Sequence, residues 1–368
     1  MRALSLGLFA IAALGCGSEE TVVDDPPAHR PLDCAFEVDE AFAALTLPGG
    51  QPITQHWEMT STPRGALYAP VQKREFAPWL TGIARFDGTW TVEPLAGEWQ
   101  NIWDVAASDE EAWMAGEVGR YPTTPAIVQR NGGAWTEIDR PAGTHAVHRL
   151  LAVGRTLFAI GVEENEPVYT PFFARRDATG WKRLAAPSEW PESWPGPVAL
   201  VGTEVVVGFT VRPTSGLPKD ASRGLLARVD GDRLVPLTTS IELPPIGVIS
   251  GSGLHDLLVL GGLGGYGQPT VHWLDTVGGR GKLVHVDREW FADVWSPRPG
   301  VALLAPSHYH AGRLTVLDGL TGPREVELWK PGELHYVARF APEGDGRTVH
   351  FLAHLEGRKV QHVRGVCR

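Results

Sequence analysis

Several features typical of enzymes, nucleic-acid-binding proteins and membrane-spanning proteins are scarce or missing in this chain. No apolar stretch reaches about 18 unbroken residues, so no transmembrane helix is expected. The net charge of −10 argues against nucleic acid as a partner, because binding it requires a basic face. No Ser–His–Asp order and no nucleophile elbow occurs, so the sequence spells out no hydrolytic reaction. The chain has only 3 cysteines, and two thiolates alone fall short of a zinc site.

Glycine, proline and tryptophan are abundant instead. The chain contains 43 Gly, 30 Pro and 14 Trp but few long helical patterns, which indicates many short strands joined by tight turns. An all-β fold is therefore predicted. Because only 6 Tyr and 3 Met accompany the tryptophans, the positions of the tryptophans are informative.

The N-terminus has the pattern of an export signal. Arg2 is followed by an apolar run over residues 3–14 that is too short to span a bilayer permanently. The letters "ALGC" that end at Cys16 resemble the lipobox of bacterial lipoproteins. This resemblance implies a cleaved signal peptide over residues 1–15 and lipidation of Cys16, and Gly17 favours the outer membrane by analogy with enteric lipoproteins. The alternative is an ordinary signal peptide in which Cys16 is incidental.

Residues 16–33 are predicted to form a tether. This segment is acidic, contains proline and shows no apolar periodicity, as flexible linkers do. It would hold the folded part, residues 34–368, away from the lipid surface. Contact with the membrane is expected through the lipid anchor only.

A repeat of about 45 residues runs along the rest of the chain. Each clear copy has a strand, a turn such as "DG", "NGG" or "DATG", and a second strand that opens with tryptophan, which is a hairpin pattern. The arginine before the turn and the tryptophan after it recur at spacings of 45 or 46 residues: Arg85, Arg130 and Arg175, and Trp90, Trp135 and Trp181.

A second pair of strands precedes each hairpin, and the full unit occurs 7 times. Repeated four-stranded units of this length predict a seven-bladed β-propeller. The last unit supplies only three strands, so the N-terminal piece from Cys34 is expected to complete it, with "FAALTLPGG" in the register of the outermost strands. Cys34 would then lie beside Cys367, and a disulfide between them is predicted. Two free thiols are the alternative.

The hairpins "RFDGTW" and "RNGGAW" resemble a shortened Asp-box turn of sialidase-type propellers. The Trp-rich blades also resemble those of the photosystem assembly-factor group and of propeller lipoproteins from soil bacteria. Sialidases carry an arginine cluster at the ring centre, but Arg85, Arg130 and Arg175 occupy the same position on three different blades. Each is expected to pair within its own blade, and no catalytic residue is assigned.

Histidines and loop aromatics are the remaining candidates for chemistry. His308 and His310, and His350 and His354 with His335 and His362 nearby, could bind zinc or copper, but nothing completes a ligand set by spacing, and no metal or cofactor is predicted. The loops that join second to third strands, or one blade to the next, carry aromatic residues near carboxylates, which suits sugar rings or extended peptides. The candidate binding face consists of Trp99, Tyr121, Tyr169, Trp190, Trp194 and Tyr266. The alternative is that these side chains pack between blades.

The sequence thus favours an envelope lipoprotein, expected to be monomeric, whose propeller binds a protein or glycan without catalysis. A carbohydrate-active enzyme, hydrolase or lyase, and a structural assembly factor are the alternatives. An enzyme should have acid and base groups clustered in the central channel. A binding protein should have aromatic loops on one face and an unremarkable channel.

Overall fold

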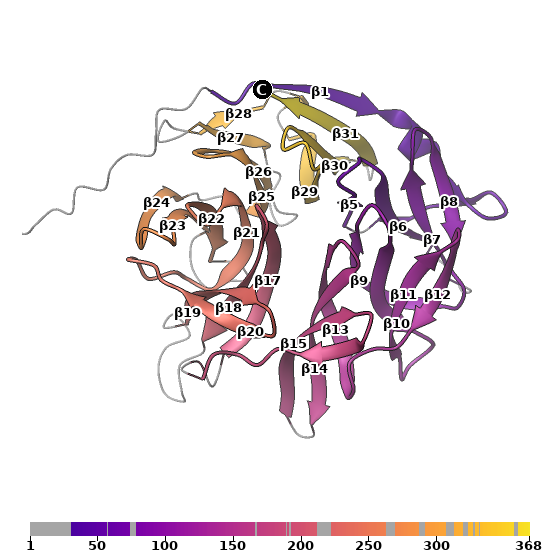
Figure 1. Ribbon diagram of the computed structural model, residues 1–368. Coiled ribbons are helices and arrows are strands. Elements are labelled where there is room, and N and C mark those ends of the chain that lie inside the picture. Colours follow the sequence, from indigo (N-terminus) through magenta and orange to yellow (C-terminus); the bar gives the residue numbers. More distant parts are fainter. Residues whose placement is uncertain are drawn as a thin grey trace, which may run out of the picture.

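The computed structural model is a seven-bladed β-propeller in which antiparallel sheets surround a central axis (Figure 1). It describes residues 31–56, 58–73, 79–165, 168–188, 190, 193–211, 222–262, 269–286, 291–306, 313–318, 323–326, 328–330, 332–356 and 360–368. Among these residues, no helix is both long and apolar enough to cross a membrane.

Blades one to four follow one another along the chain. Blade one comprises β4 (Gln55–His56), β5 (Thr60–Ser61), β6 (Leu67–Lys73), β7 (Leu80–Phe86) and β8 (Trp90–Pro94). Blade two comprises β9 (Trp99–Ala107), β10 (Ala112–Val118), β11 (Thr124–Asn131) and β12 (Ala134–Ile138). Blade three comprises β13 (Thr144–Val153), β14 (Thr156–Asn165), β15 (Val168–Asp177) and β16 (Gly180–Arg183). Blade four comprises β17 (Ser193–Val201), β18 (Glu204–Val211), β19 (Arg223–Asp230) and β20 (Arg233–Leu237).

Blades five and six continue in the same order, and blade seven joins the two ends of the chain. Blade five comprises β21 (Ile246–Gly253), β22 (Asp256–Gly261), β23 (Thr270–Asp275) and β24 (Arg280–Val286). Blade six comprises β25 (Phe291–Arg298), β26 (Val301–Pro306), β27 (Thr315–Asp318) and β28 (Arg324–Glu325). Blade seven comprises β29 (Leu334–Pro342), β30 (Thr348–Leu355), β31 (Val360–Cys367) and the N-terminal β1 (Cys34–Asp39). The short 3₁₀-helix η1 (Glu40–Ala44) and the ribbon of β2 (Thr46–Leu47) and β3 (Gln51–Pro52) lead from β1 to blade one.

The predicted hairpin turns form where the sequence places glycine. In the "NGG" turn between β11 and β12, Gly132 and Gly133 have φ of 58° and 92°. Glycine adopts this left-handed backbone without the steric cost that a Cβ atom brings. The repeated turn letters therefore mark the boundary between the third and fourth strands of a blade.

The ring is closed by pairing between the two ends of the chain. β1 runs antiparallel to β31, with Cys34 directly opposite Cys367, and a disulfide joins these residues across a sequence separation of 333. The predicted disulfide is therefore confirmed. Its strand differs from the expected one, because Cys34–Asp39 pairs with β31, whereas "FAALTLPGG" forms η1 and the β2–β3 ribbon. Asp39 ends the strand because its carboxylate accepts a hydrogen bond from the Ala41 amide at 2.8 Å and caps η1.

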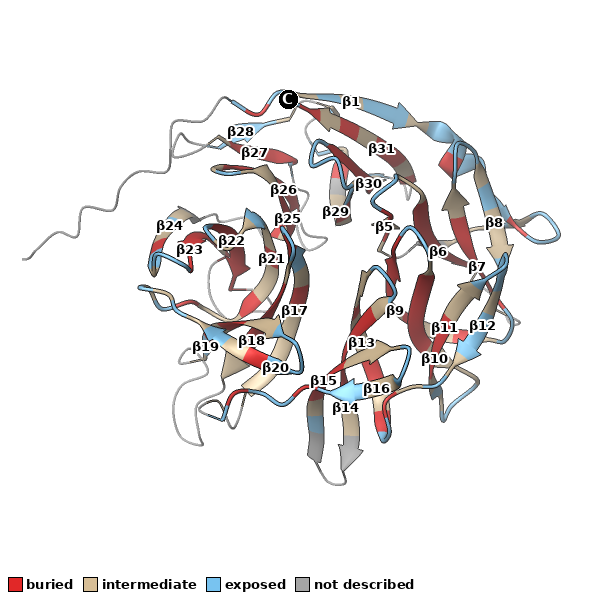
Figure 2. Cartoon of the chain, in the orientation of Figure 1, coloured by how far each residue is buried: buried red, intermediate tan, exposed pale blue. Residues whose placement is uncertain are grey.

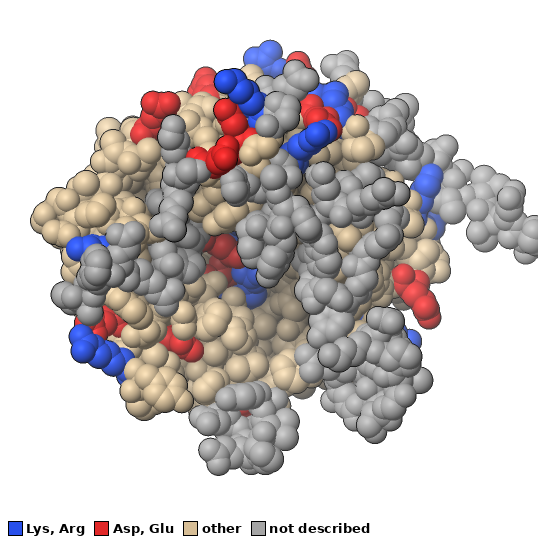
Figure 3. All heavy atoms as spheres, turned by 180° about the vertical axis from the view of Figure 1, so that it is seen from behind, with Lys and Arg blue, Asp and Glu red and all other residues tan. Residues whose placement is uncertain are grey.

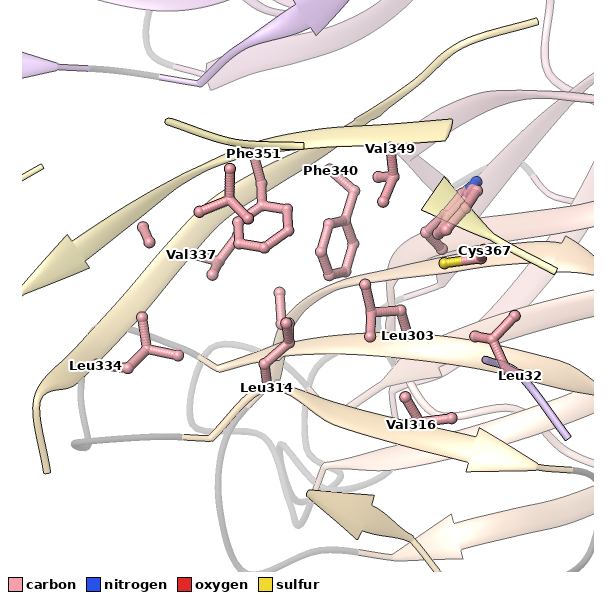
Figure 4. Packing of buried hydrophobic residues seen from close by; sticks show 14 of the residues in the cluster. Leu32, Leu303, Leu314, Val316, Leu334, Val337, Phe340, Val349, Phe351 and Cys367 are labelled. Carbon is pink, nitrogen blue, oxygen red and sulfur yellow. The ribbon is translucent and has the colours of Figure 1, made fainter. Parts of the chain in front are cut away.

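Apolar side chains fill the space between neighbouring blades. Figure 2 shows that the inner strands are largely buried, whereas exposed residues gather on outer strands such as β8 and β12. Between blades six and seven, Phe340 and Phe351 lie edge to face with ring centroids 5.6 Å apart. They face Leu303 of β26 in the same core, which also includes Cys367 (Figure 4). The disulfide is thus packed into the last inter-blade core.

Candidate functional site: the central channel

A cavity of about 580 Å³ occupies the centre of the ring. The innermost strands of the blades line it, and Figure 3 shows acidic and basic side chains side by side in the hollow at the centre of one face. This volume is in the range of small-molecule sites. The channel is therefore large enough to admit a small ligand.

Four of the charged side chains are joined in one network. Nη1 of Arg149 donates to both carboxylate oxygens of Glu58 at 2.9 Å. Nη1 of Arg339 donates to Oε2 of Glu58 at 3.0 Å and to Oδ1 of Asp104 at 2.8 Å. The network therefore links blades one, two, three and seven across the channel.

Two aspartates of the innermost strands also bind the backbone of the next blade. Asp104 accepts hydrogen bonds from its neighbour Val105 at 2.9 Å and from the Leu150 amide of blade three at 2.8 Å. Asp293 does the same in blade six, accepting from the Val294 amide at 2.9 Å and from the Phe340 amide of blade seven at 2.6 Å. These carboxylates therefore hold the inner strands of adjacent blades together.

Burial and pairing change the acidity of these groups in different directions. Burial raises the pKa of Asp104 to about 6, against the lowering effect of Arg339. Burial also raises the pKa of Asp293 to about 6, again opposed by Arg339. Burial alone would raise the pKa of Glu58, but Arg149 and Arg339 together outweigh it and lower that pKa. Glu58 is therefore held ionised, while the two aspartates titrate much closer to neutral pH.

The sequence analysis missed this cluster. Its members recur at one position of the repeat, with spacings of 46 residues from Glu58 to Asp104, 45 from Asp104 to Arg149 and 46 from Asp293 to Arg339. All but Glu58, which lies between β4 and β5, stand in the innermost strand of their blade. Repeated ionisable residues inside strands that otherwise bury apolar side chains were the signal that could have revealed them. The cluster of acid and base groups that was expected of an enzyme is present, although most of its members are paired with one another.

The candidate binding face is only partly brought together. Tyr121, in the connection between β10 and β11, is 96 % exposed. Trp190 and Trp194 are half-buried, and the ring of Trp190 lies 5.5 Å from that of Phe209. Trp99 is 1 % exposed and packs in the core between blades one and two, as the alternative interpretation expected.

Other predicted residues are not tested. The side chain of Tyr169 in β15 lies outside the described part of the chain, as do Tyr266, the neighbouring acids Glu189 and Glu192, and the lipidation candidate Cys16. His308 and His310 are also outside it. Among the described residues, no group of three or more His, Cys, Asp or Glu side chains is arranged to hold a metal ion.

Two of the three repeated arginines join neighbouring blades, which corrects the expectation that each pairs within its own blade. Arg130 of blade two makes a bidentate pair with Glu93 of blade one, with Nε to Oε2 at 2.9 Å and Nη2 to Oε1 at 2.8 Å. Arg175 of blade three pairs with Asp232 of blade four at 2.8 Å as well as with Asp177 of its own hairpin. Arg85 alone follows the expectation, pairing with Asp87.

The repeated tryptophans have the same role as these arginines. The indole N–H of Trp90 donates to Asp39 of blade seven at 2.8 Å, and that of Trp135 donates to Glu93 of blade one at 2.9 Å. Trp181 donates to the carbonyl of Asp139, which follows blade two, at 2.9 Å. Each tryptophan thus binds the preceding blade of the ring, which explains why it recurs at one position.

Two buried histidines of blade seven lie in a chain of polar contacts that runs from Glu343 to Asp39 of β1. His350 Nε2 lies 2.7 Å from Glu343, His350 Nδ1 lies 3.0 Å from His362 Nε2, and His362 Nδ1 lies 3.4 Å from Asp39. Two neutral imidazoles have only two N–H groups between them, so at most two of these three contacts receive a hydrogen bond from a histidine. The distances assign one proton to the Glu343–His350 bond and one to the His350–His362 bond, leaving the longest gap to Asp39 without one.

Acidification should therefore destabilise the folded protein, because burial favours the neutral form of both imidazoles. Burial lowers the pKa of His362 to about 4 and also lowers that of His350, so the unfolded chain takes up protons below pH 6.5 that the folded chain does not. The contribution of His362 is present above pH 6.5 and is lost as the pH falls, by about 2 kcal/mol between pH 7.5 and pH 5. Urea denaturation at both pH values should show that His362→Gln is less sensitive to acid than the wild type by this amount. Equal sensitivity of the two proteins would contradict the lowered pKa of His362 in the folded protein.

No protein-family model and no curated protein sequence matches this chain. Several solved structures share its fold. A puromycin-hydrolyzing peptidase of Mycobacterium tuberculosis is 13 % identical with a TM-score of 0.59, over 84 % of this chain and 51 % of that chain. The β-propeller domain of the Trilobed protease from Pyrococcus furiosus is 10 % identical with a TM-score of 0.57, over 84 % of this chain and 95 % of that domain. The WD40 propeller domain of Doa1 is 8 % identical with a TM-score of 0.50, over 85 % of this chain and 96 % of that domain.

These similarities show the fold alone, because the identities are at most 13 %. The chain spans about half the length of the peptidase from M. tuberculosis. It spans nearly the whole length of the two structures that consist of a propeller domain alone. The Trilobed protease domain is described as having an open velcro topology, whereas here β1 pairs with β31 and closes the ring. The resemblance of the repeats to Asp-box and photosystem assembly-factor repeats stays a prediction from the sequence.

Proposed function

We propose that this protein is an envelope-anchored lipoprotein whose propeller binds a protein or glycan partner without catalysis. Residues 1–15 serve as the signal peptide, lipidated Cys16 anchors the chain in the outer membrane, and residues 16–33 form the tether. Three acyl chains on one cysteine anchor a protein firmly, since each buried methylene contributes about 0.8 kcal/mol. The propeller is then presented to partners within the envelope or at its surface.

The observation that carries this proposal is the way Tyr121 is held in solvent. Among the described residues, Tyr121 is the one aromatic side chain in the group of exposed large apolar residues. The adjacent Arg120 makes a bidentate pair with Glu98, at 2.9 Å and 3.2 Å, and the Gly119 amide donates to the Glu98 carbonyl at 2.8 Å. The loop is thus fixed before binding, which reduces the entropy lost when a partner covers the ring.

Tyrosine is also suited to the proposed ligands. Its ring offers a large apolar surface with one polar end, which is why such residues are enriched in binding interfaces. By the topology of a blade, the Tyr121 loop lies on the same face as the connection that carries Trp190 and Trp194. These three aromatic residues supply the proposed recognition surface, and the paired Glu98 and Arg120 supply polar contacts at its edge.

The channel supports a second candidate, a carbohydrate-active enzyme. Asp293 lines the cavity, and its pKa of about 6 would allow it to donate or accept a proton near neutral pH. The remaining channel acids favour the first proposal, because Glu58 and Asp104 are bound to Arg149 and Arg339. Release of reducing sugar from envelope glycans, abolished in Asp293→Asn, would favour the enzyme.

Capture from the native envelope tests the binding proposal. The lipidated protein is crosslinked in intact envelopes as the wild type, as Tyr121→Ala, and as Val277→Ala, which removes a 60 % exposed apolar side chain on blade five. One defined partner should be captured by the wild type and by Val277→Ala but reduced at least tenfold in Tyr121→Ala. Equal capture by all three proteins would remove Tyr121 from the interface, and no specific capture would overturn the binding role.

A further inference from the structure

Among the described residues, Asp293 is the carboxylate of the cavity lining that neither a guanidinium nor an imidazole binds. Glu58, Asp104 and Asp293 surround two guanidiniums, Arg149 and Arg339, so one negative charge is in excess when these five groups are ionised. Glu343 also lines the cavity, but its Oε1 lies 2.7 Å from Nε2 of His350. Both guanidiniums are already bound to Glu58 or Asp104. In the part of the chain that the structure describes, no Lys, Arg or His lies within ion-pair distance of Asp293, so the excess charge is located there.

Asp293 is placed to receive a ligand. It is 7 % exposed and lines the cavity, and each of its oxygens accepts one backbone amide. An ionised carboxylate can accept about four hydrogen bonds, so acceptor capacity is left on the cavity side. A buried carboxylate without a counter-charge is costly, and a cation that enters the cavity would remove this cost.

Blades four and five form an apolar part of the channel wall. Blades four and five present Pro197, Ala199 and Val248 to the cavity, whereas blades one, three, six and seven present charged side chains at this level. A molecule in the channel therefore meets both a charged part and an apolar part of the wall. An anion fits less well, because it would add to the existing excess negative charge and compete with Glu58 for Arg149.

We propose that the channel binds an organic cation, an ammonium or guanidinium group on a short apolar body, with the cationic group paired to Asp293. The apolar body lies against Pro197, Ala199 and Val248. The cationic group comes either from a free amine or from a lysine or arginine side chain of a peptide. This site is separate from the loop surface around Tyr121, so the two proposals succeed or fail independently.

Titration of the folded protein with a matched series of small molecules tests this site. Benzylamine should bind the wild type, whereas benzyl alcohol and benzoate should bind at least tenfold more weakly in calorimetric titrations. Asp293→Asn should weaken benzylamine binding at least tenfold. Asp275→Asn removes a carboxylate that is equally buried but is paired with Arg280 and does not line the cavity, and it should change the affinity less than threefold.

Two further measurements keep the test decisive. Val248→Phe leaves Asp293 in place but fills the apolar side of the cavity, so it should also abolish benzylamine binding. An N-acetylated hexapeptide with one lysine should bind if the natural ligand is a peptide side chain, and fail to bind if only free amines enter; acetylation of that lysine should abolish any binding. Preference for benzoate, absence of benzylamine binding to the wild type, or equal losses in Asp293→Asn and Asp275→Asn would overturn the proposal.

Discussion

Replacing both Cys34 and Cys367 by serine is expected to lower the free energy of unfolding by as much as about 5 kcal/mol. The disulfide closes a loop with a sequence separation of 333, and in the chain-entropy model so long a loop contributes on the order of 5–6 kcal/mol, an upper figure. The bond also joins β1 to β31, the strand pair through which the N-terminal part of the chain completes blade seven. Urea denaturation of the double variant and of the wild type with and without reductant measures the effect.

Hydrogen exchange should locate the weakness that this change creates. Amides of β1 and β31 should exchange faster in the double-serine variant, because only strand pairing and the inter-blade core then hold β1 in place. Amides of blades three and four should change much less. A loss of stability below about 1 kcal/mol, with unchanged exchange in β1, would mean that the disulfide is not what keeps the ring closed.

Replacing Arg339 by methionine is expected to cost about 3 kcal/mol of unfolding free energy. The guanidinium of Arg339 is shared by Glu58 and Asp104, and removing one partner of a buried pair leaves a carboxylate without its counter-charge. We expect the lower end of the usual range, because Arg339 keeps 29 % of its side chain exposed to the channel. Urea denaturation at pH 7.5 measures this loss.

Arg155→Met is the matched control for this loss. Arg155 pairs with Glu110 on the surface, where the two side chains are 80 % and 52 % exposed, and such pairs contribute at most about 1 kcal/mol. At pH 5 the deficit of Arg339→Met should shrink, because protonation of Asp104, whose pKa is already about 6, removes a buried charge. Equal effects of Arg339→Met and Arg155→Met would contradict a structural role of the channel network.

The fold was predictable because its turns and tryptophans repeat in the sequence. The "DG" and "NGG" turns mark hairpins, and Trp90, Trp135 and Trp181 recur because each donates its indole N–H to the preceding blade. The choice of closing strand was less predictable. Both Cys34–Asp39 and "FAALTLPGG" alternate acceptably for a strand, and the cap that Asp39 forms on η1 decides between them.

The candidate site was much less predictable than the fold. Asp104 and Arg149 stand inside strands whose apolar neighbours dominate the pattern, Glu58 lies between two short strands, and the three meet only because the blades form a ring. Trp99 was predicted to be exposed, because its neighbours in the sequence are typical of a loop. In the structure its indole is buried in the core between blades one and two. Burial of a single side chain at the start of a strand is set by the neighbouring blade, which a local pattern does not contain.

Photo-crosslinking from position 121 tests the proposed binding role most directly. A photoreactive phenylalanine derivative replaces Tyr121, and in a control protein it replaces Val277, which is 60 % exposed on blade five. Irradiation of intact envelopes should give one defined crosslinked species from position 121 and none from position 277. The same products from both positions, or none from position 121, would contradict the account of this propeller as a recognition platform.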